Sequence, residues 1–366
     1  MIAALTKLTD QLLGRGEAAV TVPPFDGALK PNQYLEDAAI FAELEELEDL
    51  ASDGKDLFAA QERKVLRFAD GEAREIARFD APVTALCVLS DGGIAVALDG
   101  RRIAIRGGRH DGKSFDAAAG GAFTSINALA ATGEGKLIAT EGSRTQPFEK
   151  WCHDLMQRGS SGRVVELDPA TGAARELAKG TAFAFGACAT PAGEIWFSES
   201  WRHRLVVSEG PRAGKALIDS LPVYPSRMAP AAGGGFWLTA FTARTQLVEF
   251  VLRENAYRRR MMAEIEPRFW IAPKLSSGHT FLEPMQGAHI KTMGILKPWA
   301  PPVSYGLVIR LSPEGEPVYS LHSRTGGHNH GIVAAVECGE DLYVLAKGRG
   351  RILRLPIDKI EAELRQ

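Results

Sequence analysis

Short apolar segments separated by glycine-containing turns recur along this chain. Each repeat has an apolar strand, a turn with glycine, a second apolar strand and a third strand that begins at a basic residue. The turn glycines are about 40 to 60 residues apart, the spacing at which multi-stranded repeats form propeller blades. Six repeats fill the chain, and this predicts an all-β, six-bladed propeller. The repeats are expected to begin at Leu50, Val83, Ser125, Phe185, Pro225 and Gly331.

A fourth, outer strand is expected after most repeats. Its alternation of apolar and polar residues is imperfect, as in sheets that are packed on both faces. The early apolar segment Ala18–Val22 is predicted to pair with the last repeat and close the ring, which removes an open sheet edge. The expected outer strands are Ala73–Phe79, Ala173–Leu177, Lys215–Ile218 and Pro317–Leu321.

Two insertions interrupt the repeats. Gln146–Gln157 predicts a short helix in blade 3, and residues 245–302 form a longer insertion in blade 5, helical at its start and then rich in Pro, Trp, His and Met. Long ordered loops are often lids or binding walls, so Trp270 and Trp299 are expected to contact a substrate. The alternative is that the long insertion forms a dimer contact.

The N-terminal segment has apolar residues at helical spacing. Leu5, Leu8 and Leu12 fall on one face, so residues 1–16 predict a short amphipathic helix and no secretion signal. The whole chain, 1–366, is expected to be one propeller domain.

Composition narrows the functional classes. The 366 residues are 45% apolar and 24% charged with a net charge of −2, so neither nucleic acid nor an anionic membrane is an expected partner. The four cysteines are far apart, which argues against a disulfide framework and a cysteine metal cluster. We expect a cytoplasmic protein, monomeric or homodimeric, that acts on a small molecule.

Site residues in a propeller should come from the starts of the innermost strands, near the central channel. Glu48, Asp49 and Asn127 are oxygen donors that suit a hard cation such as Ca²⁺. His330 is a candidate general acid or base, and Arg227 can bind a carboxylate or replace the charge of a metal ion. Phe185 and Ser226 complete the starts of blades 4 and 5 as candidate substrate contacts.

Each of these candidate site residues also has an explanation that involves no function. A Glu-Asp pair before a strand is often solvated. A hydrogen bond from Asn127 to the backbone of its own turn would explain that residue without a ligand. His330 follows a glycine-rich loop, where histidines are often exposed and inert. Arg227 can pair structurally with Glu48 or Asp49. Only the expected position near the channel favours the functional interpretation.

Several phrases together resemble proteins of the strictosidine synthase-like family, over about residues 25 to 356. That resemblance implies a six-bladed propeller related to paraoxonases and to the senescence-marker/gluconolactonase hydrolases. The phrases are Asp26–Asn32, Gly162–Gly172, Trp196–Ser200, Leu221–Pro225, Gly235–Leu238, Tyr305–Val308 and Asp341–Val344.

The resemblance implies only part of a known site. Leu47–Leu50 is similar to the paraoxonase phrase whose Glu and Asp bind calcium, and Asn127 matches a further ligand. Phe185 stands where another Asn ligand is expected, and Ser226-Arg227 stands where the next ligand is expected. The catalytic Glu of strictosidine synthases should fall between His330 and Val333, where the chain has no acid. We therefore expect a polar site whose calcium is lost or weakened.

Three functions follow. The first is hydrolysis of a small cyclic or aryl ester, by a metal that activates water or, without one, by Glu48 or His330 as base and Arg227 as oxyanion stabiliser. The second is a metal-free lyase or condensing reaction of the strictosidine synthase type. The third is binding of a small molecule without catalysis, under the long insertion.

Overall fold

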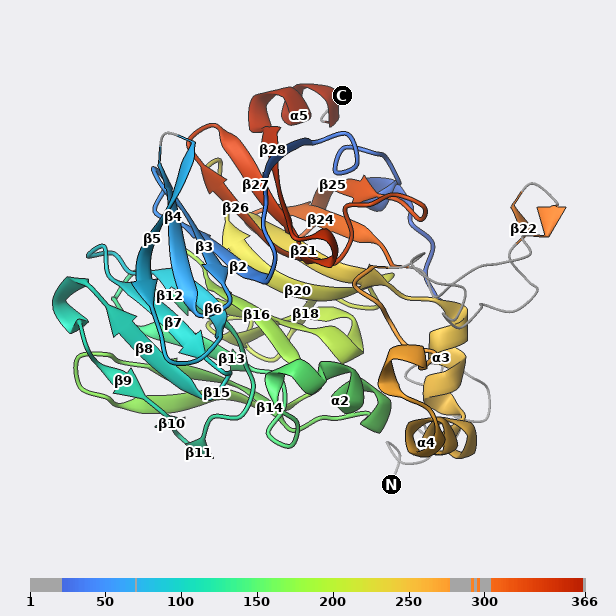
Figure 1. Cartoon of the computed structure of the whole chain (residues 1–366), viewed down its shortest axis with the longest axis horizontal. Coiled ribbons are helices and arrows are strands. Elements are labelled where there is room, and N and C mark those ends of the chain that lie inside the picture. The colour runs from blue at the N-terminus through green and yellow to red at the C-terminus, as the bar shows by residue number, and fades with distance from the viewer. Residues whose placement is uncertain (1–21, 70, 277–290, 293–294, 297–303, 365–366) are drawn as a thin grey trace.

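The computed structural model of the chain describes residues 22–69, 71–276, 291–292, 295–296 and 304–364. Six four-stranded antiparallel sheets are arranged as the blades of a propeller (Figure 1), so the predicted fold is confirmed. In chain order the inner strands contact one another as a closed ring: β2 (Leu47–Ser52), β6 (Val83–Val88), β12 (Ile126–Ala131), β16 (Ala184–Ala189), β20 (Val223–Pro230) and β26 (Ile332–Cys338).

The remaining strands extend each blade outward in sequence order. Blade 1 adds β3 (Leu57–Gln61), β4 (Lys64–Ala69) and β5 (Glu72–Arg78). Blade 2 adds β7 (Ile94–Leu98), β8 (Arg102–Arg106) and β9 (Ser114–Phe115). Blade 3 adds β13 (Leu137–Glu141), β14 (Gly162–Leu167) and β15 (Ala174–Thr181). Blade 4 adds β17 (Ile195–Glu199), β18 (Arg204–Glu209) and β19 (Ala216–Ile218). Blade 5 adds β21 (Phe236–Ala243), β24 (Gly306–Leu311) and β25 (Pro317–Ser323). Blade 6 adds β27 (Asp341–Ala346) and β28 (Arg351–Pro356).

Burial explains why the second strands are almost uniformly apolar. Every residue of β7 is buried, because its sheet packs against blades on both faces, whereas β5 at the rim is mostly exposed. Two short hairpins, β10 (Ala117–Ala118) with β11 (Gly121–Ala122) and β22 (Lys291–Thr292) with β23 (Ile295–Leu296), lie outside the blades.

The ring is closed by a different strand from the one that the sequence predicts. β1 (Ala39–Glu43) pairs antiparallel with β28 as the outer strand of blade 6, with Ala39 opposite Arg354. In Figure 1 the blue β1 runs beside the red β28. The closing strand was therefore placed about 20 residues too early, and the proposed segment lies, except for Val22, outside the described residues, as does the predicted helix at 1–16.

Phe41 of β1 connects the last blade to the first. Its ring packs 5.2 Å from Phe68 of blade 1 and 4.9 Å from Tyr343 of blade 6, measured between ring centroids. We expect Phe41→Ala to destabilise the protein by about 2 kcal/mol, less than a fully buried Phe because the ring is half-buried. Thermal denaturation measures this, with Ile40→Ala as the control because Ile40 is 49% exposed. Equal losses in both variants would contradict the closing role of Phe41.

Helices lie in the insertions and at the C-terminus. The blade 3 insertion contains a 3-10 turn (Phe148–Lys150) and α2 (Trp151–Gln157), which confirms its predicted helix. The blade 5 insertion begins with α3 (Gln246–Arg253) and α4 (Asn255–Glu264), and these lie on the same flank as α2 (Figure 1). Thr245 caps α3 by accepting the Val248 N–H. α5 (Ile357–Leu364) follows β28. Among the described residues, no helix is long and apolar enough to cross a bilayer.

Candidate functional site

Every inner strand has a β-bulge at the same position. In blade 1, for example, Leu47 pairs with Gln61 and Asp49 with Ala60, so Glu48 is left out of the ladder. A bulge re-aims a side chain and leaves backbone groups without ladder partners. These bulges direct residues from all six blades toward the propeller axis. The bulged residues are Glu48, Thr84, Asn127, Phe185-Gly186, Ser226-Arg227 and Val333.

Arg227 uses these bulges to join the blades. Its guanidinium donates to the backbone carbonyls of Thr84 at 2.8 Å, Asn127 at 2.7 and 3.1 Å, Glu48 at 3.1 Å and Val333 at 3.4 Å. These five hydrogen bonds match the five N–H donors of an arginine. The side chain is buried. It therefore connects blade 5 to blades 1, 2, 3 and 6 at the axis.

Phe185 and Asp49 complete the surroundings of the guanidinium. The Phe185 ring lies 5.3 Å from the Arg227 carbon Cζ, in a cation–π contact. Asp49 Oδ2 is 3.2 Å from Arg227 Nε, and the carboxylate also accepts the N–H groups of Leu50 and Leu86. Burial raises the pKa of Asp49 to about 6, although the guanidinium and the two N–H groups lower it. Asp49 is thus a buried anion at neutral pH, paired with the axial cation.

The raised pKa of Asp49 predicts a specific pH dependence. The folded state binds this proton more tightly than the unfolded chain, whose aspartate has the ordinary value of 3.8. Stability from this group is therefore present below about pH 3.8 and is lost as the pH rises to about 6. The Tm of the wild type minus that of Asp49→Asn should fall between pH 4 and pH 6 and stay level above pH 7. A difference that rises over this interval would contradict the assignment.

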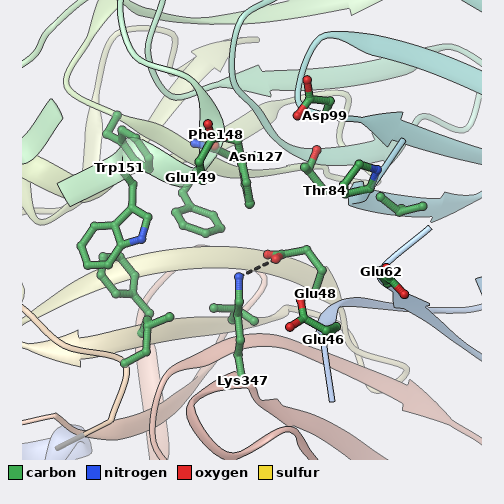
Figure 2. Close-up of a pocket in the computed structure, with 17 residues that line it drawn as sticks. Glu46, Glu48, Glu62, Thr84, Asp99, Asn127, Phe148, Glu149, Trp151 and Lys347 are labelled. Atoms are coloured by element: carbon green, nitrogen blue, oxygen red, sulfur yellow. Dashed lines mark hydrogen bonds and ion pairs between the residues drawn. The ribbon is translucent and has the colours of Figure 1, made fainter. Parts of the chain in front are cut away.

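Glu48 directs its carboxylate away from the backbone hub and into a cavity. Its Oε2 forms an ion pair with Lys347 Nζ (Figure 2), and its Oε1 is 3.9 Å from Arg227 Nη2. Lys347 comes from a 3-10 turn (Lys347–Arg349) between β27 and β28, and its ammonium lies 5.6 Å from the Phe148 ring. The side chains of Glu48 and Lys347 are 15% and 27% exposed, so solvent or a ligand can reach both.

The turn that carries Lys347 is held tightly. Gly348 donates to the carbonyl of His330, and a Cβ on Gly348 would lie 2.2 Å from the carbonyl oxygen of Leu275. Only glycine allows this approach, which packs the Lys347 turn against the blade 5 insertion.

The cavity has a volume of about 440 Å³, within the range of small-molecule sites. Inner strands supply its floor and the two insertions supply part of its wall. Figure 2 shows Trp151 across the cavity from the Glu48–Lys347 pair. Five aromatic rings and five carboxylates line it, with Lys347 as its one cationic lining residue among those described. The lining residues are Glu46, Glu48, Glu62, Pro82, Val83, Thr84, Asp99, Asn127, Phe148, Glu149, Trp151, Phe183, Phe185, Phe241, Leu275, Val333 and Lys347.

Of the candidates from sequence, Glu48, Asn127 and Phe185 line this cavity. Asn127 donates its amide N–H to the Ala184 carbonyl of the next blade at 2.8 Å. Ser226 is fully buried and contacts the Thr239 hydroxyl and the Ile332 carbonyl. The structure therefore gives Asn127 and Ser226 inter-blade hydrogen bonds, and it places Ser226 outside the cavity lining.

His330 and Trp270 lie away from the cavity lining. Burial lowers the pKa of His330, and its two ring nitrogens contact the Ser304 hydroxyl and the Arg324 carbonyl. The blade 6 residue that faces the axis is Val333 and not the predicted His330, because β26 begins at Ile332, one residue after the expected start at Gly331. Trp270 packs 4.7 Å from His153 of α2 and attaches the insertion to that helix. Trp299 lies outside the described residues.

The residues at the axis do not fit a calcium ion. The guanidinium of Arg227 already donates hydrogen bonds to the carbonyls of Glu48, Thr84 and Asn127. The side-chain amide of Asn127 donates to the Ala184 carbonyl of the neighbouring blade. In the part of the chain that the structure describes, no three His, Cys, Asp or Glu residues gather as a metal site. The predicted ligands Glu48, Asp49 and Asn127 therefore surround an arginine side chain, and a metal role for them stays an untested prediction.

Sequence reasoning missed Lys347, Phe148 and Trp151. Lys347 lies in a short turn of glycine and basic residues, which is typical of an exposed loop, and its contact with Glu48 spans nearly the whole chain. The blade 3 insertion was predicted as a helix without a role. Its aromatic residues next to a strand end were the available signal for a cavity wall.

Comparisons with known proteins agree with this architecture. No protein-family model matches the chain. Among curated proteins the chain is similar to strictosidine synthase-like 4 of Arabidopsis thaliana, with 24% identity over 262 residues. The match covers 70% of this chain and 61% of that protein, so it spans less than two thirds of the relative's length. The predicted resemblance is confirmed at this level.

Solved structures share the fold. A gluconolactonase from Xanthomonas campestris superposes with a TM-score of 0.55 and 14% identity, over 92% of this chain and 95% of that one. Regucalcin from Agrobacterium tumefaciens, a calcium-binding protein, superposes with a TM-score of 0.51 and 13% identity, over 87% and 92% of the two chains. At such low sequence identities the superpositions show a shared propeller fold only. The reaction must therefore be inferred from the residues of the site.

Proposed function

We propose that this protein is a metal-independent hydrolase that cleaves a small aryl ester in the cavity beside Glu48. The observation that carries the proposal is the Glu48–Lys347 ion pair, which faces a cavity with aromatic walls. A carboxylate and an ammonium side by side supply a base and a positive charge without a metal ion. The aromatic walls favour an aryl ester over a sugar lactone because they offer apolar area and stacking surfaces.

The roles follow from the positions of the two side chains. Glu48 takes a proton from a water molecule as its oxygen attacks the ester carbonyl, and Lys347 stabilises the oxyanion that forms. When the intermediate collapses, the bond between the carbonyl carbon and the aryloxy oxygen breaks, and the proton passes from Glu48 to the leaving phenolate. The products are a carboxylic acid and a phenol.

Of the parts that the sequence suggested for Arg227, we assign it the structural one and not that of oxyanion stabiliser. Its N–H donors are used by backbone carbonyls below the cavity, so it is not placed to stabilise an oxyanion. It acts instead on the backbone of Glu48 and fixes the bulge from which the carboxylate projects. The oxyanion role passes to Lys347.

A panel of aryl acetates and lactones tests this proposal. We expect hydrolysis of aryl acetates, with kcat lowered by about 10²–10³-fold in Lys347→Met, the usual loss when one oxyanion donor is removed. Lys136→Met is the control because Lys136 lies away from this cavity. Absence of ester and lactone turnover, or equal rates in the two variants, would overturn the proposal.

A second candidate is the metal-free condensation of an amine with a carbonyl compound. It is favoured by the lining, where five carboxylates face one ammonium and five aromatic rings can hold a cation. The name of the curated relative supports the same reaction class. Glu48 would then be the acid–base residue that handles the imine. An aryl-alkyl amine and an aldehyde that react faster with the protein than with Glu48→Gln, in the absence of ester turnover, would favour this candidate. Binding of the amine without turnover would favour a binding propeller.

A further inference from the structure

The axis of this propeller is built like a cation site. Four backbone carbonyls from blades 1, 2, 3 and 6 and the Asp49 carboxylate each lie within 3.4 Å of a guanidinium nitrogen of Arg227. Carbonyl and carboxylate oxygens are the ligands of hard divalent cations. Their common partner here is the guanidinium of Arg227, which arrives from blade 5. We propose that Arg227 is a built-in cation that occupies a latent divalent-cation site.

Electrostatics requires a cation at this position. Asp49 is buried, and an ionised buried carboxylate is costly without a partner of opposite charge. The carbonyls of the bulged residues are left without ladder partners and also need donors or a cation. Arg227 meets both needs with one side chain.

Charge balance explains why a divalent ion is excluded while Arg227 is present. Glu48 and Asp49 carry two negative charges, and Arg227 and Lys347 carry two positive charges close to them. The cluster is neutral. A further cation would meet the guanidinium within a few Å and would be repelled.

Removing the side chain of Arg227 should therefore open the site. Arg227→Ala leaves the carbonyls and Asp49 around an empty space with a net charge of −1. Adding Lys347→Met raises this to −2 and should strengthen cation binding. Arg227→Met removes the same charge but keeps a long side chain in the space, so it is the matched control. This inference concerns the axis and holds whichever reaction the cavity performs.

Calorimetric titration and thermal denaturation with and without millimolar CaCl₂ test the inference. We expect Ca²⁺ to bind Arg227→Ala with one-to-one stoichiometry and to raise its Tm, to bind the Arg227→Ala/Lys347→Met variant more tightly, and to leave the wild type and Arg227→Met unchanged. Binding by the wild type, or a folded Arg227→Ala variant whose Tm does not respond to Ca²⁺, would overturn it.

If Arg227→Ala does not fold by itself, refolding from denaturant gives the same test. Recovery of the native circular dichroism spectrum with CaCl₂ but not with NaCl of equal ionic strength supports the latent site. Failure in both salts contradicts it. Because these measurements do not use activity, they separate this inference from the proposed hydrolysis.

Discussion

Glu48→Gln is expected to lower kcat/KM for aryl acetates by about 10²–10⁴-fold, the range that general-base catalysis contributes. The amide keeps the shape of the side chain and cannot accept the proton of the attacking water. The Glu48 carbonyl still receives its hydrogen bond from Arg227, so the bulge and the fold should persist. Steady-state kinetics at neutral pH, with circular dichroism to confirm the fold, measures the effect.

Glu46→Gln is the matched control for this variant. Glu46 lines the same cavity two residues away. Its substitution removes the same charge from the lining and should leave kcat within a few-fold of the wild type. An equal loss in both variants would mean that the cavity's negative charge, rather than a base at Glu48, supports the reaction.

Arg227→Met is expected to destabilise the protein by about 3–5 kcal/mol, the cost of removing one partner from a buried ion pair. The variant leaves Asp49 buried without its cation and the carbonyls of four blades without donors. Urea denaturation followed by tryptophan fluorescence measures the change. Arg74→Met is the control and should change stability by less than about 0.5 kcal/mol, because Arg74 is exposed at the rim.

A double-mutant cycle shows whether Asp49 is the reason for this loss. Adding Asp49→Asn to Arg227→Met removes the unpaired carboxylate, so the double variant should be more stable than the sum of the two single losses predicts. The expected coupling is about 1–3 kcal/mol. Strict additivity would contradict the assignment of Asp49 and Arg227 as a buried pair.

Much of the fold could be predicted because each repeat has a local sequence pattern that identifies its strands and turns. Apolar strands and glycine turns recur in every blade, and burial on both sheet faces explains their uniform hydrophobicity. The closing strand was missed for a physical reason. The segment Ala39–Glu43 lies among alanine, leucine and acidic residues, which favour helix. Pairing with β28, a contact more than 300 residues away, imposes the strand.

The residues near the axis could be located where the inner strands have unambiguous starts. Glu48, Asn127, Phe185 and Arg227 were placed at the axis from the repeat alone. In blade 6 a glycine-rich loop precedes the strand, so His330 was expected at the axis, where the structure places Val333. Lys347 could not be predicted because its partner is remote in sequence and its own turn has no distinguishing pattern.

One measurement tests the central claim most directly. That claim is that Glu48 and Lys347 catalyse ester hydrolysis beside an axis that Arg227, and no metal ion, holds together. The measurement is kcat/KM for phenyl acetate before and after exhaustive chelation with EDTA, followed by addition of CaCl₂. We expect one unchanged value under all three conditions. Loss of turnover on chelation and its return with CaCl₂ would contradict the claim.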